Sequence, residues 1–429
     1  MTTLAPAAAR RVFLLLTASR WFPVGLVVGV TTLLPIERGL GVAQTLSLAS
    51  ITGAVVFALE LPTGGTADAL GRRPVLVTAA AVQVVAATLF CVAQDFWMFA
   101  IAAATTGLFR ALDSGPLEAW FVDAVHATNP GADVDRTLSR QSAVLGGSIA
   151  LGALISGGLV WWHPVTVWSA LTLPYVVYAA LAVAHLVLVC VLLKEASAER
   201  ARRGAEESRL RRAVAAARQA PAVIADGLRL VRTNRVLLAL MLVEVFWSTA
   251  MVVFESLQPI RLAELLGSEE QAGAIMGPVA SVGWGVFALG ATLAGLMARR
   301  IGVVRTAMAA RVLNGLGAVW MGLVAGPAAL IAAYLVTYGL HGSGGPVYHA
   351  LLHREAESRN RSTVLSMASM TGFATFAVAA PVLGAVSEAW STQTAMVLGG
   401  GFSVLGVLCF VPALRRERAL HAGRDVVSM

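Results

Sequence analysis

The sequence predicts an all-α membrane protein with twelve transmembrane helices in two pseudo-symmetric six-helix bundles. Three observations lead to this fold class. Of 429 residues, 57% are apolar and 13% are charged, whereas an ordinary soluble domain is about 25% charged. Apolar stretches of about 20 residues, the length that crosses a bilayer core, recur along the chain, and the mean hydropathy is +0.75. A single long polar segment divides these stretches into two sets of six.

Each span is predicted from an apolar run bounded by polar or charged residues. The first run is too long for the core of a cleaved signal peptide, so we expect it to remain in the mature protein. The predicted spans are 12–36, 42–66, 74–94, 96–120, 139–161, 165–193, 236–260, 272–298, 304–325, 327–348, 363–388 and 393–413.

The distribution of basic residues predicts the orientation. If the N-terminus lies inside, the outer loops carry only Arg38 and Arg261, and the inner loops carry most of the other arginines. Cytoplasmic loops are enriched in Lys and Arg. We therefore expect a multi-pass protein of the bacterial cytoplasmic membrane with both termini in the cytoplasm. The formal net charge of +8 then reflects topology, and no nucleic-acid partner is expected.

Four segments follow from this division. Residues 1–193 form the N-terminal six-helix bundle, 194–235 a cytoplasmic linker, 236–413 the C-terminal bundle and 414–429 a cytoplasmic tail. The linker holds eleven Lys/Arg and five Asp/Glu residues in a helix-favouring composition. We expect it to be partly helical, as a solvated tether or a lipid-binding arm.

The two halves share short motifs in the same order. Ser114-Gly115-Pro116 resembles Gly344-Gly345-Pro346, and Asp135-Arg136-Thr137 resembles Asn360-Arg361-Ser362. A six-span duplication is an established way to build a transporter whose substrate site lies between its halves.

The loop after the second span carries the most specific motif. It reads Gly64-Gly65-Thr66-Ala67-Asp68-Ala69-Leu70-Gly71-Arg72-Arg73. This resembles the loop signature of the major facilitator superfamily, Gly-x-x-x-Asp-x-x-Gly-Arg-Arg/Lys. The resemblance in span number, loop position and central linker covers the whole chain, and it implies that fold and secondary active transport.

The resemblance also implies a conformational latch. In the family, the carboxylate equivalent to Asp68 meets the N-terminal end of span eleven, where the helix dipole favours an anion. Arg73 is expected to reach Asp123 at the cytoplasmic end of span four. Gly64, Gly71 and Arg72 complete the predicted latch.

Partial motifs resemble the drug/proton antiporter branch of multidrug efflux proteins. Glu60-Leu61-Pro62-Thr63-Gly64 matches the Glu-x-Pro-x-Gly sequence that precedes the loop in that branch. Span four of the antiporters carries Arg-x-x-Gln-Gly, and here Arg110 is followed by Asp113 in place of the glutamine. The fifth-span antiporter motif is also incomplete, because its proline is missing.

Ionisable residues inside predicted spans are the candidates for proton coupling, because an unpaired charge there is costly. Arg20 and Glu244 lie at matching depths in spans one and seven, and Asp113 lies one helical turn from Arg110. We expect Arg20, Arg110, Asp113 and Glu244 to form a buried network, with Glu244 or Asp113 as the proton carrier. A static cluster that fastens the helices is an equal alternative.

Aromatic residues near these charges are candidates for the substrate cavity: Trp21, Phe22, Phe246, Trp247 and Tyr338. Arg311, by contrast, is expected to extend its guanidinium to the cytoplasmic surface from an outer helix.

The leading functional hypothesis is a proton-coupled exporter of hydrophobic or amphipathic drugs or secondary metabolites. Two alternatives stay open: a proton symporter that imports a small polar metabolite, and a membrane receptor that transports nothing. No convergent catalytic set or phosphate-binding motif predicts an enzyme or an ATP-driven pump. His349 and His353 have metal-ligand spacing without a third ligand, so we expect no metal. We also expect no cofactor, and a monomer in the lipid bilayer.

Overall fold

The computed structural model describes residues 5–194, 229–356 and 361–427, with side chains described except at 60–62, 64–70, 362 and 420–427. Within these residues the chain forms helices and no strand. The predicted linker lies largely outside the described residues. The all-α membrane fold class predicted from composition is confirmed.

The helices of the first half follow the predicted spans, with a break in the first and another in the fourth, and the sixth becomes helical only at Leu173. They are α1 (Pro6–Val28), α2 (Leu33–Glu37), α3 (Val42–Leu70), α4 (Arg72–Val92), α5 (Phe96–Asp113), α6 (Pro116–His126), α7 (Asp135–Trp162) and α8 (Leu173–Leu192).

The helices of the second half include two departures from α geometry. The π-helix η1 interrupts span seven, and the short 3-10 helix η2 interrupts span twelve. The elements are α11 (Arg235–Met251), η1 (Val252–Leu257), α12 (Gln258–Leu266), α13 (Glu269–Ile301), α14 (Val303–Leu323), α15 (Pro327–Glu355), α16 (Arg361–Ala389), α17 (Thr392–Leu405), η2 (Gly406–Phe410) and α18 (Val411–Val427).

Nine helical stretches within the described residues are long and apolar enough to cross a membrane. The predicted spans outside this set correspond to α5, α14 and α15. Their apolar content is lower because α5 contains Arg110 and Asp113, α14 contains Arg305 and Arg311, and α15 is rich in glycine and histidine. The count of twelve therefore stays a prediction.

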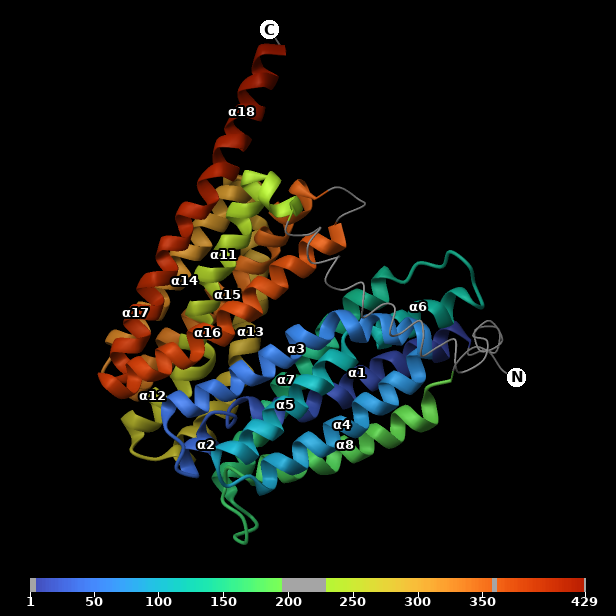
Figure 1. Ribbon diagram of the computed structural model, residues 1–429, viewed down its shortest axis with the longest axis vertical. Helices are drawn as coiled ribbons and strands as arrows, with labels where there is room; N and C mark the ends of the chain where they lie inside the picture. The colour runs from blue at the N-terminus through green and yellow to red at the C-terminus, as the bar shows by residue number, and fades with distance from the viewer. Residues whose placement is uncertain (1–4, 195–228, 357–360, 428–429) are drawn as a thin grey trace. The chain divides into compact units, whose positions relative to one another are not determined.

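The chain divides into two compact units. Unit 1 contains Met1–Leu40, Ile51–Ala220 and Glu269–Ser281, and unit 2 contains Gly41–Ser50, Pro221–Ser268 and Val282–Met429. The main division falls within the predicted linker, but the first residues of α3 and of α13 each group with the other unit. Within unit 1, α4 lies along α8 (Figure 1).

Each unit has its own apolar core. In unit 1, Phe13 of α1 stacks on Phe121 of α6 with ring centroids 4.5 Å apart, and both rings are buried. In unit 2, Leu237 and Leu240 of α11 pack with Phe410 of η2. Other large apolar side chains are exposed, as expected of helices that face lipid, and these include Leu151, Val187, Leu289 and Val378.

Glycines allow the backbone arrangements that position the charged residues of unit 1. Gly115 adopts φ +88° between α5 and α6, so the helix of span four breaks two residues after Asp113. At the crossing of α1 and α7, a Cβ on Gly152 would lie 2.3 Å from the carbonyl oxygen of Phe22. Only glycine permits this approach, so Gly152 lets α7 pack directly against the backbone of α1 next to Arg20.

Arg38 has a structural role that its loop position does not reveal. Its guanidinium donates hydrogen bonds to the carbonyl oxygens of Cys91 (3.1 Å) and Ala93, and to the Thr172 hydroxyl (2.8 Å). Positive charge at a helix C-terminus satisfies carbonyl groups that lack partners. Arg38 therefore caps α4 and ties it to the start of α8.

Candidate functional site

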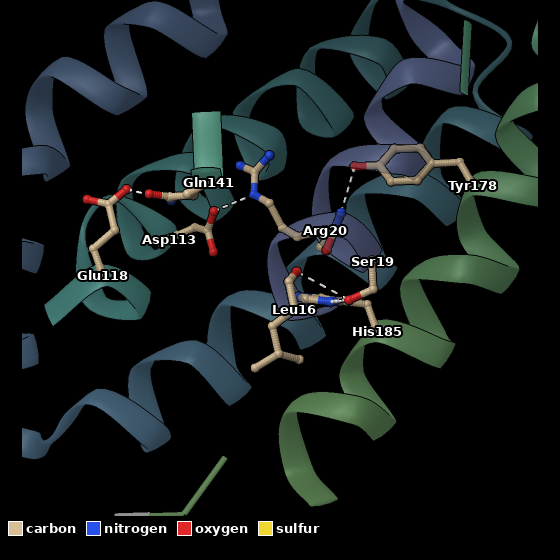
Figure 2. A network of polar contacts seen from close by, with 9 residues as sticks. Leu16, Ser19, Arg20, Asp113, Glu118, Gln141, Tyr178 and His185 are labelled. Carbon is tan, nitrogen blue, oxygen red and sulfur yellow. Dashed lines mark hydrogen bonds and ion pairs between the residues drawn. The ribbon is translucent and has the colours of Figure 1, made fainter. Parts of the chain in front are cut away.

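A buried ion pair joins α1 and α5 in unit 1. Arg20 Nε donates to Asp113 Oδ2 at 2.5 Å, and the two side chains are 8% and 14% exposed. The Arg20 guanidinium also lies 3.7 Å from the ring centroid of Trp21 and 4.9 Å from that of Phe109. The structure thus brings together two of the four predicted network residues, Arg20 and Asp113 (Figure 2). It also places the predicted cavity aromatic Trp21 against Arg20.

Polar side chains from neighbouring helices surround this pair. The Ser19 hydroxyl and His185 Nδ1 are 2.8 Å apart, which joins α1 to α8. Gln83 of α4 donates to the Tyr178 hydroxyl of α8 at 3.3 Å. Figure 2 shows Ser19, Tyr178 and His185 on one side of Arg20. On the other side, beyond Asp113, Gln141 donates a hydrogen bond to Glu118 at 2.7 Å.

Glu244 lies in unit 2 and is 5% exposed. Its electrostatic partner there is Arg311, and Tyr348 also interacts with it. A Cβ on Gly372 of α16 would lie 3.2 Å from Glu244 Oε2, so the carboxylate faces that helix. Arg20, which was expected in the same network as Glu244, belongs to unit 1 and is paired there with Asp113.

Arg311 does not reach the surface as the sequence predicted. It is 4% exposed, and its guanidinium lies 4.3 Å from the ring centroid of Trp247 and 5.6 Å from that of Tyr348. The prediction was wrong because α14 directs this side chain at α11 and α15 instead of along its own axis toward the helix end.

An aromatic cluster in unit 2 surrounds His341 of α15. Its ring centroid lies 5.1 Å from Trp247, 4.8 Å from Phe254, 5.4 Å from Phe287 and 5.7 Å from Tyr338. Two of these residues, Trp247 and Tyr338, were predicted from the sequence. His341, Phe254 and Phe287 were missed, although His341 is a histidine within an apolar span and was a usable signal.

The remaining predicted aromatics lie elsewhere on their helices. Phe246 stacks on Phe402 of α17 at 4.8 Å, because successive helical residues point about 100° apart and Trp247 takes the direction toward His341. Phe22 is half-buried on α1. Arg110, expected in the buried network, has an exposed side chain.

The predicted latch is described in part. Arg72 Nε lies 3.7 Å from Asp123 Oδ2, and Arg73 donates to the Cys190 carbonyl oxygen at 2.9 Å. Gly71 has φ +110° at the start of α4, a conformation that favours glycine. Gly64 lies in α3, and the Asp68 side chain lies outside the described residues.

Long apolar helices with charged side chains buried among them are features of a multi-pass membrane protein. The chain belongs to the Major Facilitator Superfamily, whose family model matches residues 13–345 and 256–426. Secondary active transport of small molecules is the activity of this class. No curated protein sequence matches the chain.

Solved structures share the fold at low sequence identity. The nucleoside transporter NupG is 11% identical with a TM-score of 0.75, and the match covers 94% of this chain and 98% of that chain. The peptide transporter POT in complex with sulfate is 15% identical with a TM-score of 0.69, covering 94% of both chains. A POT family transporter in complex with 5-aminolevulinic acid is 14% identical with a TM-score of 0.66, covering 93% and 95%.

Proposed function

We propose that the chain is a proton-coupled exporter of hydrophobic or amphipathic compounds that works by alternating access. It acts as a monomer in a bacterial cytoplasmic membrane, with both termini in the cytoplasm and the proton gradient as its energy source. No cofactor takes part.

The electrostatic interaction between Glu244 and Arg311 carries the proposal. Glu244 is 5% exposed and Arg311 is 4% exposed, so neither charge is solvated by bulk water. When Glu244 is ionised, the two charges compensate each other. When it is protonated, Arg311 is left with an uncompensated positive charge, which is costly in a buried setting. Proton binding at Glu244 and ligand binding near Arg311 are therefore coupled energetically.

Substrate character is supported by the aromatic cluster around His341. Four aromatic rings have centroids between 4.8 and 5.7 Å from that of the imidazole. Aromatic faces of this kind suit flat apolar compounds. Export, as opposed to import, rests on the resemblance of Glu60-Leu61-Pro62-Thr63-Gly64 to the efflux branch.

A second candidate is a proton symporter that imports a small polar metabolite. It is favoured by polar atoms in the same cluster that have no hydrogen-bond partner in the described structure: Arg311 Nη2, Trp247 Nε1 and His341 Nδ1. A purely apolar substrate would leave these atoms unsatisfied.

Vesicle assays of both orientations distinguish these functions. Everted vesicles that generate an acidic interior should accumulate dyes and drugs from a mixed panel, and accumulation should stop when a protonophore collapses the gradient. Accumulation only in right-side-out vesicles would favour the symporter, and absence of transport in both would favour a receptor.

The same assay tests the proton site. Glu244→Gln keeps the shape of the side chain without its titratable proton, so it should lose gradient-driven accumulation and retain downhill exchange. Glu264→Gln is the matched control, because Glu264 is exposed in the same unit and pairs with Arg261 at 3.0 Å. Full gradient-driven transport by Glu244→Gln would refute the assignment and direct attention to Asp113.

A further inference from the structure

Three neighbouring buried polar atoms in unit 2 lack hydrogen-bond partners among the described residues. They are Arg311 Nη2, Trp247 Nε1 and His341 Nδ1. The guanidinium and the indole N–H can only donate, and each buried donor that is left unsatisfied costs about 1–3 kcal/mol. A protein tolerates such a cost when a ligand supplies the missing acceptors.

The three groups come from different helices. Trp247 of α11 contacts both of the others, because its ring is 4.3 Å from the Arg311 guanidinium and 5.1 Å from the His341 ring. Arg311 comes from α14 and His341 from α15. A Cβ on Gly344 would lie 3.1 Å from Arg311 Nη1, so the absence of a side chain there leaves room for the guanidinium.

Flat apolar side chains border the same groups. Phe254 and Phe287 contact His341 at centroid distances of 4.8 and 5.4 Å, and Tyr338 contacts it at 5.7 Å. Offset stacking and edge-to-face contacts with aromatic rings favour a planar ligand.

The charges nearby admit two kinds of acceptor oxygen. Glu244 already compensates Arg311 electrostatically, so a neutral acceptor oxygen satisfies the donors without adding a charge. A carboxylate can also supply the acceptor, but with Glu244 ionised it adds a second negative charge beside a single arginine.

We propose that Trp247, Arg311 and His341 form a recognition subsite for a planar ring that carries an acceptor oxygen, either a neutral carbonyl or a carboxylate. This inference rests on the proposed transport function and specifies its substrate class. The oxygen accepts from Arg311 Nη2 and Trp247 Nε1, and the ring lies among Phe254, Phe287 and Tyr338.

Binding of three matched probes to the purified full chain in lipid nanodiscs tests the subsite. Benzamide offers a neutral carbonyl, benzoate offers a carboxylate, and thiobenzamide has the ring and shape of benzamide, without a charge, but a weakly accepting sulfur in place of the oxygen. Saturation-transfer NMR of the ring protons gives each dissociation constant without a proton gradient. Benzamide or benzoate should bind more tightly than thiobenzamide, and the better of the two identifies the oxygen that the subsite prefers.

Trp247→Phe is the informative variant, because it removes the indole N–H and retains an aromatic ring. It should weaken binding of the preferred probe about 3- to 10-fold, the value of one hydrogen bond, and change the binding of thiobenzamide much less. Trp320→Phe is the matched control, since Trp320 is 43% exposed in the same unit, and it should have no effect. Arg311→Lys retains the charge and removes the planar fork, so it should weaken the same probe further.

Equal binding of all three probes, no binding of any, or an unchanged dissociation constant in Trp247→Phe would each overturn the subsite. These results are independent of the transport mechanism. Failure of the vesicle assay together with oxygen-dependent binding here would refute the transport function and leave the subsite in place.

Discussion

Replacing Asp113 by Asn should destabilise unit 1, because it leaves the Arg20 guanidinium charged and buried. The two side chains are 8% and 14% exposed and meet at 2.5 Å. Asparagine retains the size and one acceptor oxygen of the aspartate, so the substitution removes the charge with little change of shape.

The magnitude follows from three contributions. At an effective dielectric constant of about 20, two unit charges at this separation attract by about 7 kcal/mol before desolvation is subtracted. Breaking a buried pair by removing one partner costs about 3–5 kcal/mol in practice. The rings of Trp21 and Phe109 at 3.7 and 4.9 Å retain about 1–2 kcal/mol of attraction for the cation. We therefore expect Asp113→Asn to lower the free energy of unfolding by about 1–4 kcal/mol.

Denaturant unfolding in detergent, followed by tryptophan fluorescence, measures this loss. Asp95→Asn is the matched control, because Asp95 caps the other end of α5 by accepting from Trp97 and Met98 and asparagine caps equally well. The double variant Arg20→Gln with Asp113→Asn should recover most of the loss, since no isolated charge remains buried. If Asp113→Asn is as stable as the wild type, or if the double variant is the less stable of the two, the pair does not hold α1 to α5 in this way.

Three further predictions concern transport and topology. Gly372→Ala places a methyl group 3.2 Å from the buried Glu244 carboxylate oxygen, so it should reduce gradient-driven transport more than protein abundance. Gly401→Ala is the control, because there is open space around Gly401, and it should transport normally. Equal transport rates of the two variants would contradict the packing argument. Asp68→Asn should insert normally and impair transport, and wild-type transport by this variant would count against the latch. In a background without native cysteines, a cysteine at Glu37 should react with an impermeant reagent added outside the cell and one at position 206 should not; labelling at 206 would reverse the orientation.

The fold class was predictable because it depends on local properties of the sequence, such as the length and hydropathy of each apolar run. Apolar runs of bilayer length and the Asp68–Gly71–Arg72 motif can each be recognised without knowing which helices touch. The same holds for the family, which the motif indicated and the family model confirmed.

The partners of buried charges were less predictable, since they depend on contacts between helices. Spacing within one helix pointed to Arg110 as the partner of Asp113, whereas the structure pairs Asp113 with Arg20 of α1. Arg311 was assigned to the surface, although it lies about two turns into its helix, much as Glu244 does. Applying one depth criterion to every intramembrane arginine would have identified it.

The π-helix η1 affects the direction in which the following helix, α12, faces. A π turn holds more residues than an α turn, so Val252–Leu257 delays the rotation of everything that follows. Removing one residue from this segment would let the backbone return to α geometry and leave α12 facing nearly the same way, because six π-helical residues turn the chain about as far as five α-helical ones. Gln258, which is fully buried and whose side-chain polar atoms have no partner among the described residues, would keep its direction. A deletion in the regular α-helix of the same span would instead turn α12 by about 100° and draw it back by about 1.5 Å.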